Sequence, residues 1–129
     1  MKALVTGAPE PAAHLAESLR AAAVEAVADE VPEDASEGEI AALAQELVRL
    51  EDALLELQPA AVLLVDADDR SLAAALVATK LLIPVAAIGL DGAAGENALL
   101  LTQLVDRKLS ADSEEIAGWM EALPNIRGP

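Results

Sequence analysis

The chain has 129 residues, which predicts a single domain spanning residues 1–129, and its 54% hydrophobic content excludes general disorder. Its 23 acidic and 8 basic residues give a net charge of −15, which repels phosphate backbones and argues against nucleic acid as a partner. It contains no cysteine, which excludes disulfides and thiolate chemistry and fits a cytoplasmic protein. We expect neither a signal peptide nor a membrane span, because no apolar run has the required length or flanks.

The amino-terminal part is predicted to form a strand, a turn, a helix and a second strand. The turn contains Pro9 and Pro11, and proline is favourable in a first helical turn. The helix carries Leu15 and Leu19 on one face. The expected ranges are Lys2–Thr6 for the strand, Gly7–Pro11 for the turn, Ala12–Ala22 for the helix and Val24–Ala28 for the second strand.

An acidic segment follows, with six acidic residues between Asp29 and Glu39, and we expect a solvated loop leading into a helix. Glu39–Leu57 is the longest predicted helix, and its apolar residues recur at spacings of three and four. These apolar residues are Ile40, Leu43, Leu47, Leu50, Leu54 and Leu57. The sequence leaves two interpretations open: a helix lying on the sheet, or a helix–helix seam between the subunits of a homodimer.

The segment Pro59–Gly89 reads as a strand, an acidic turn, a buried helix and a second strand, which is a βαβ unit with parallel strands. Asp69 or Ser71 is expected to cap the helix, and Pro84 follows its end. The expected ranges are 62–65 and 85–88 for the strands and 71–82 for the helix. Ligands of such sheets bind beyond the carboxyl ends of the strands, which predicts a site at 66–71 and 89–95.

The carboxyl-terminal part predicts a helix over 96–105, a short strand over 108–111 and a last helix. Asp112 or Ser113 is expected to cap that helix, and Pro124 to end it. The alternation of strands and helices predicts an α/β fold: one doubly wound, Rossmann-like domain with a mostly parallel sheet.

Several polar residues near the predicted site could have either a functional or a purely structural role. Asp66, Asp68 and Asp69 could bind Mg²⁺, but a capped, solvated turn is favoured because the sequence offers no further ligands. Arg70 could meet a phosphate, although pairing with the neighbouring aspartates is favoured. His14 has no evident partner and is expected at the surface. The turn 91–95 could close over a ligand or serve as a plain connection.

Two common nucleotide-binding motifs are absent from the sequence. The loop after the first strand is not a Gly-x-Gly-x-x-Gly fingerprint, and no Gly-Lys-Ser/Thr P-loop occurs. We therefore expect no cofactor and no metal. A signalling receiver domain would fit the length and acidity, but no acidic pair follows the first strand.

Several short segments, in order, resemble the amino-terminal domain of the UDP-N-acetylglucosamine 2-epimerases. The residues are Met1 to Glu10, Pro59 to Asp68 with Ala73 to Leu76, Ile83-Pro84-Val85, Glu96-Asn97 with Leu101 to Asp106, and Ser110 to Glu114. The resemblance covers nearly the whole of this chain but only the amino-terminal half of the family's proteins. It implies the first domain of a glycosyltransferase-B fold and a UDP-sugar ligand. In the family, UDP is eliminated and re-added, which requires acid/base groups and phosphate ligands.

The chain differs from the family at the positions that supply these acid/base groups and phosphate ligands. The family's His-x-Glu after Ile-Pro-Val has no counterpart in Ala86–Gly89, and Ala98 stands where the family has an arginine. The arginine of the family's opening Gly-Thr-Arg-Pro-Glu is also missing, since Ala8-Pro9-Glu10 follows Gly7. The resemblance leaves Asp68 as the single candidate catalytic residue. The candidate ligand-binding residues are Gly7, Asp66, Arg70, Ser71 and Glu96.

Two functional hypotheses follow. The first is a stand-alone, degenerate epimerase-like domain without catalysis, acting as a binding or assembly module and forming a homodimer through Glu39–Leu57. The second is one subunit of a split nucleotide-sugar enzyme, an epimerase or glycosyltransferase, whose carboxyl-terminal domain is a separate chain. The acidity of the predicted site favours the first hypothesis, because a UDP-sugar site needs cations or helix N-termini facing the phosphates.

Overall fold

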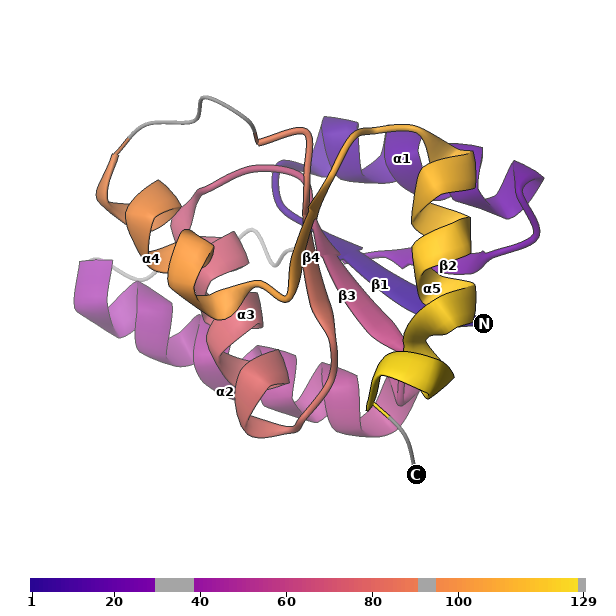
Figure 1. Ribbon diagram of the computed structural model, residues 1–129. Helices are drawn as coiled ribbons and strands as arrows, with labels where there is room; N and C mark the ends of the chain where they lie inside the picture. The colour runs from indigo at the N-terminus through magenta and orange to yellow at the C-terminus, as the bar shows by residue number, and fades with distance from the viewer. Residues whose placement is uncertain (30–38, 91–94, 128–129) are drawn as a thin grey trace.

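A computed structural model describes residues 1–29, 39–90 and 95–127 of the chain, and only the backbone from residue 124 onward. In these ranges five strands alternate with five helices, which confirms the predicted α/β fold (Figure 1). The elements are β1 (Lys2–Thr6), α1 (Pro9–Ala21), β2 (Glu25–Ala28), α2 (Glu39–Leu57), β3 (Ala61–Leu64), α3 (Asp69–Lys80), β4 (Val85–Ile88), α4 (Glu96–Leu104), β5 (Arg107–Leu109) and α5 (Ser113–Arg127). None of the helices in the described part of the chain is long and apolar enough to cross a membrane.

The five strands form one sheet in the order β2-β1-β3-β4-β5, and every neighbouring pair is parallel. The central strands are buried on both faces because successive side chains point to opposite sides of a strand. In β3, Leu63 packs with one hydrophobic cluster, while Val62 and Leu64 pack with the other. This explains why the sequence of β3 reads as an unbroken apolar run.

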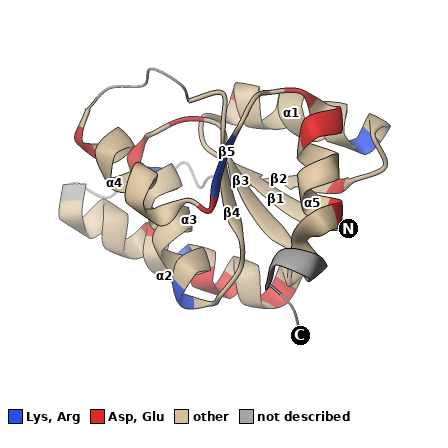
Figure 2. Cartoon of the chain, in the orientation of Figure 1, with Lys and Arg blue, Asp and Glu red and all other residues tan. Residues whose placement is uncertain are grey.

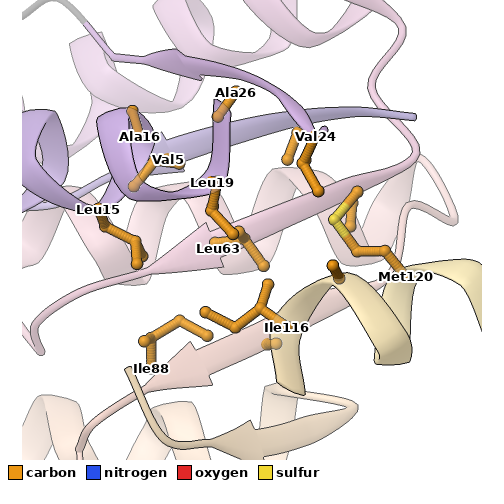
Figure 3. Packing of buried hydrophobic residues seen from close by; sticks show 14 of the residues in the cluster. Val5, Leu15, Ala16, Leu19, Val24, Ala26, Leu63, Ile88, Ile116 and Met120 are labelled. Atoms are coloured by element: carbon orange, nitrogen blue, oxygen red, sulfur yellow. The ribbon is translucent and has the colours of Figure 1, made fainter. Parts of the chain in front are cut away.

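The helices cover both faces of the sheet, as a doubly wound fold requires. Helices α1 and α5 lie on one face, and α2, α3 and α4 lie on the other (Figure 1). The first cluster joins Leu15 and Leu19 of α1 to Ile116 and Met120 of α5 across the strands (Figure 3). The expected common face of Leu15 and Leu19 is therefore confirmed.

Helix α2 has the bounds that its apolar spacing predicts. Leu50 and Leu54 are fully buried in the second cluster, and Leu43, Leu47 and Leu57 are partly buried against it. Ile40, at the start of the helix, is 79% exposed. The interpretation of α2 as a helix packed within its own chain is confirmed from Leu43 onward.

Some predicted helix ends differ from the structure. Helix α3 begins at Asp69 and is capped by Asp68, whose side chain accepts a hydrogen bond from the Ser71 amide, so the expected cap at Asp69 or Ser71 is wrong. Helix α5 continues past Pro124 to Arg127. Proline removes one hydrogen bond but has a helical φ, so it weakens a helix near its end without having to terminate it. The predicted cap at Asp112 is confirmed, because its Oδ1 accepts from the Glu114 amide.

The acidic segment before α2 is largely outside the described residues, as is the turn at 91–94. Asp29 is described, and it is not a solvated loop residue as expected. Its side chain is 5% exposed, and it accepts hydrogen bonds from Arg49 and from the buried Thr6 hydroxyl. Charge pairing with a residue from α2 is what makes burial of this carboxylate tolerable.

Candidate functional site

The sheet order places a topological switch point between β1 and β3. From β1 the chain connects outward to β2 on one side, while β3, β4 and β5 follow on the other. In open α/β sheets, ligands bind in the crevice outside the carboxyl ends of the two strands at this point. The loops that flank this crevice are Gly7–Ala8 after β1 and Val65–Asp68 after β3. The structure therefore brings the candidate residues Gly7, Asp66 and Asp68 to one place.

The carboxylate of Asp66 bridges these two loops. Its Oδ2 accepts a hydrogen bond from the Ala8 amide, and its Oδ1 accepts from the Ser71 hydroxyl at 2.7 Å and from the Asp68 amide at 3.3 Å. Burial raises the pKa of Asp66, but these hydrogen bonds outweigh it, and the pKa lies below its ordinary value. Asp66 is thus an ionised carboxylate whose oxygens are already occupied by donors of its own chain.

Gly7 allows the two loops to approach closely. Its φ is +130°, which side-chain-bearing residues rarely adopt. A Cβ at this position would lie 2.6 Å from Cγ2 of Val65 and 3.0 Å from Oδ1 of Asp66. The glycine is therefore required by the contact between the loops, and a ligand is not needed to explain it.

Asp68 faces α3 and caps it. Its Oδ1 accepts from the Ser71 amide at 2.8 Å, and this hydrogen bond positions the carboxyl group at the helix start. Burial raises the pKa of Asp68, the Ser71 hydrogen bond lowers it, and the negative charge of Asp66 raises it, so that the pKa lies above its ordinary value. Two carboxyl groups with opposite pKa shifts are a feature of acid/base sites, but this pair also has a complete structural explanation.

Few amide donors remain at the helix starts that border the crevice. Helix α1 begins Pro9-Glu10-Pro11, and its two prolines have no N–H. The Ala8 amide before them is bound to Asp66, and the Ser71 amide of α3 is bound to Asp68. Helix N-termini bind phosphate through free amides, so these contacts and prolines reduce the number of donors that this edge offers to an anion.

Arg70 is the cation nearest this crevice in sequence. Its side chain is half-buried, and it forms no ion pair with any residue in the described ranges. The expected pairing with the neighbouring aspartates is therefore wrong. Each of the three aspartates has another partner: Asp66 binds Ala8, Asp68 caps α3, and Asp69 accepts from the Asn97 side chain at 2.9 Å.

That last contact joins the start of α4 to the start of α3. Glu96 is the first residue of α4 and is exposed, one helix further from the switch point than α3. Acidic residues occupy the beginnings of α3, α4 and α5 (Figure 2). In the described residues, no group of three acidic or histidine side chains is arranged to hold a metal ion.

Sequence reasoning missed a pocket of about 320 Å³ beside the crevice. Helix α1 lines it with His14, the end of β3 with Val65, and the end of β4 with Gly89. The remaining lining residues are Pro11, Leu15, Ser18, Ile88 and Ala111. His14 is exposed, as expected, but it faces this pocket. The available signal was its spacing of three and four from Pro11 and Ser18, which places the three on one face of α1.

Comparisons with known proteins show where this fold occurs. No protein-family model and no curated protein sequence matches the chain. Among solved structures, the chain is similar to UDP-GlcNAc 2-epimerases from Methanocaldococcus jannaschii (17% identity, TM-score 0.65) and from Neisseria meningitidis bound to UDP-GlcNAc (18% identity, TM-score 0.66). These alignments cover 99% and 100% of this chain but only 42% and 44% of those chains. The chain thus spans less than half of its neighbours' length, and the resemblance that its sequence motifs indicate is confirmed for the fold.

Proposed function

We propose that this epimerase-like chain is a degenerate UDP-GlcNAc 2-epimerase-like domain that lacks catalysis and acts as a binding or assembly module in the cytoplasm. The observation that carries the proposal is the position of Asp66. Its carboxylate joins the two loops that flank the crevice by accepting hydrogen bonds from the Ala8 amide, the Asp68 amide and the Ser71 hydroxyl.

The charge and donor balance supports the same conclusion. A UDP-sugar carries a diphosphate, which needs cations or free helix amides. This edge offers Arg70, while Asp66 remains ionised and acidic residues begin α3, α4 and α5. At the end of β4, where the resemblance implies His-x-Glu, the chain has Ala87-Ile88-Gly89. Asp68 therefore has no acid or base at the end of β4 to share proton transfer to a sugar.

The first ligand to test is nevertheless a UDP-sugar, because the Neisseria meningitidis structure is bound to UDP-GlcNAc and a Staphylococcus aureus structure of MnaA contains UDP. Calorimetric titration of the purified chain with UDP-GlcNAc, and with UDP as a control, tests the proposal. We expect no saturable heat at millimolar ligand. Saturable binding that is lost in Arg70→Ala and Asp68→Ala, but kept in the matched control Arg107→Ala on β5, would overturn it.

The alternative is a subunit of a split nucleotide-sugar enzyme, an epimerase or a glycosyltransferase. The favouring observation is that Arg70 is free of ion pairs in the described residues. Affinity purification of the full chain from its own cells tests this alternative. Recovery of a second chain that confers activity on a UDP-sugar would support it, and recovery without such a chain would exclude it.

For the assembly role, the partner we propose is a second copy of the chain, which docks through α2. The outward face of this helix carries apolar residues that its own chain does not cover. Val48 is 63% exposed and Leu55 is 55% exposed.

A further inference from the structure

The α1 pocket is the pocket of about 320 Å³ that lies beside the crevice and is lined in part by helix α1. Much of its wall belongs to the first hydrophobic cluster. Leu15 of α1 and Ile88 of β4 are buried members of that cluster, and Val65, after β3, packs against it. Leu15 and Ile88 lie at the same end of the cluster (Figure 3). A concave, mainly apolar pocket of this volume is typical of a site for a small molecule.

Two polar side chains of α1, His14 and Ser18, line the same pocket. They are four residues apart, so they are neighbours on one face of the helix. Ser18 is half-buried and His14 is exposed, and neither side chain forms a hydrogen bond with any residue in the described part of the chain. An imidazole and a hydroxyl can each donate and accept a hydrogen bond. The pair can therefore hold one polar group of a ligand.

The rest of the lining restricts the charge of that ligand. Among the lining residues, which all lie in the described ranges, there is no lysine, arginine, aspartate or glutamate. An anion would meet no partner of opposite charge, and the net charge of −15 repels it. A cation would lose hydration without gaining a carboxylate. A sugar is also a poor fit, because most of its hydroxyl groups would face apolar side chains.

Water is a poor occupant of the inner part of the α1 pocket. An ordered water in a protein typically makes about three hydrogen bonds. The side chains of Leu15, Val65 and Ile88 offer none. Replacing water with an apolar group on this wall is therefore favourable.

We propose that the α1 pocket binds a compact, uncharged molecule with an apolar body and one hydroxyl group, such as a small phenol. The apolar body lies against Leu15, Val65 and Ile88, and the hydroxyl group forms hydrogen bonds with His14 and Ser18. This inference rests on the binding role proposed above, for which it names the class of ligand.

Nuclear magnetic resonance provides a direct test, because His14 is the only histidine and the chain has no phenylalanine or tyrosine. The ring signals of His14 therefore overlap with few others. The probe is p-cresol, titrated into the full chain. We expect saturable shifts of the His14 ring signals, with a dissociation constant of about 1 mM or below. Absence of any shift up to about 10 mM would overturn the inference.

Variants of Ser18 test whether p-cresol occupies this pocket. Ser18→Ala removes one hydrogen-bonding partner and should weaken binding by about fivefold. Ser18→Leu fills part of the pocket and should weaken it by about tenfold or more. Thr79→Ala is the matched control, because it removes an exposed hydroxyl from α3 on the other face of the sheet, and it should leave binding unchanged. Circular dichroism checks that each variant is folded, and wild-type affinity in both Ser18 variants would overturn the assignment.

A second ligand tests the expected lack of charge. In 4-hydroxybenzoate a carboxylate replaces the methyl group of p-cresol, and we expect it to bind at least about tenfold more weakly. Equal or tighter binding would overturn the ligand class. These results are independent of the calorimetric titration. Saturable binding of UDP-GlcNAc would overturn the non-catalytic proposal without affecting the α1 pocket, whereas a chain that binds neither UDP-GlcNAc nor p-cresol would overturn the pocket inference alone.

Discussion

Arg49 of α2 binds the carboxylate of Asp29, beyond the end of β2, through two hydrogen bonds of 2.9 Å, one from each terminal guanidinium nitrogen. The Thr6 hydroxyl, at the end of β1, donates to the same carboxylate at 3.0 Å. The hydrogen bond to Asp29 raises the pKa of Arg49, burial lowers it and Glu46 raises it, so that the pKa is raised overall. Strand β1, the edge strand β2 and helix α2 are thereby joined by one planar, charge-assisted contact.

Replacing Arg49 should destabilise the fold more than an exposed cation would. Arg49→Met leaves Asp29, whose side chain is 5% exposed, without its charge partner, and we expect a loss of about 3 kcal/mol in the free energy of unfolding. Arg107→Met on the exposed strand β5 is the control, with an expected change within about 0.5 kcal/mol. Urea unfolding followed by circular dichroism measures both. Equal effects of the two substitutions would show that the Asp29 contact contributes no stability.

Gly7→Ala should be strongly destabilising because it combines an unfavourable φ with a steric clash. The added Cβ would lie 2.6 Å from Val65 Cγ2. We expect a loss of about 2 to 4 kcal/mol. Gly95→Ala separates the two effects, since Gly95 has φ +111° but no atom within 4 Å of the place an added Cβ would take, and should cost about 1 kcal/mol. If both variants lost the same stability, the close contact between the loops after β1 and β3 would be disproved.

The charge of Asp68 should oppose folding at neutral pH. Its pKa is raised in the folded chain, so its contribution to stability is present below the unfolded pKa and is lost as the pH rises through the folded pKa. Asp68→Asn keeps a good cap and removes the charge, so it should be more stable than the wild type at pH 7, and the difference should vanish below about pH 4. Asp68→Ala should be about 1 kcal/mol less stable than Asp68→Asn because the cap is lost.

Asp66 should show the opposite pH dependence. Its pKa is lowered, so its contribution is present above the unfolded pKa, for which the reference value is 3.8, and is lost as the pH falls through the folded pKa. Asp66→Asn should be destabilised at pH 7 and should lose less stability than the wild type on acidification from pH 4 to pH 2. Thermal unfolding across this range measures both variants. A wild-type-like acid profile for Asp66→Asn would contradict the role assigned to its carboxylate.

Leu50 should contribute far more to stability than an exposed leucine. The Leu50 side chain of α2 is fully buried in the second hydrophobic cluster. Leu50→Ala should therefore lower the free energy of unfolding by about 3 kcal/mol. Leu99→Ala, at a site that is 73% exposed, should change stability by less than about 0.5 kcal/mol. Denaturant titrations of both variants, at concentrations where the chain is monomeric, provide the comparison. A small effect at Leu50 would mean that α2 is held by something other than its own chain.

The sequence predicts the fold well because the fold depends on local patterns. The bounds of α2 and β4 follow from the spacing of apolar residues and from the short buried run Val85–Ile88, and both are confirmed. The βαβ unit follows from the order of such segments. Helix ends are harder to predict. Asp68, Asp69 and Ser71 can all act as a helix cap, so their side chains do not show at which residue α3 begins; the backbone geometry decides it.

The candidate site was predictable in its location but not in its contacts. Asp66 and Asp68 were expected at the carboxyl end of β3, and the structure places them there. The contact of Asp66 with Ala8 joins residues 58 positions apart, and that of Asp29 with Arg49 joins residues 20 positions apart. Contacts between residues so far apart in the sequence produce no periodic pattern. The sequence therefore predicts exposed acidic residues at Asp66 and Asp29, where the structure shows carboxylates with hydrogen-bond partners.

Trp119 is the only aromatic residue of the chain, and it is 7% exposed in the cluster formed by α1, α5 and the sheet. Its fluorescence therefore reports on one face of the sheet, whereas circular dichroism reports on the helices of both faces. If the layer of α2, α3 and α4 came apart first, the helical signal would fall while the indole emission stayed that of a buried ring. Coincident transitions would mean that the two faces unfold as one cooperative unit. The placement of this single ring thus gives the chain a built-in optical test of whether its two helical layers are thermodynamically coupled.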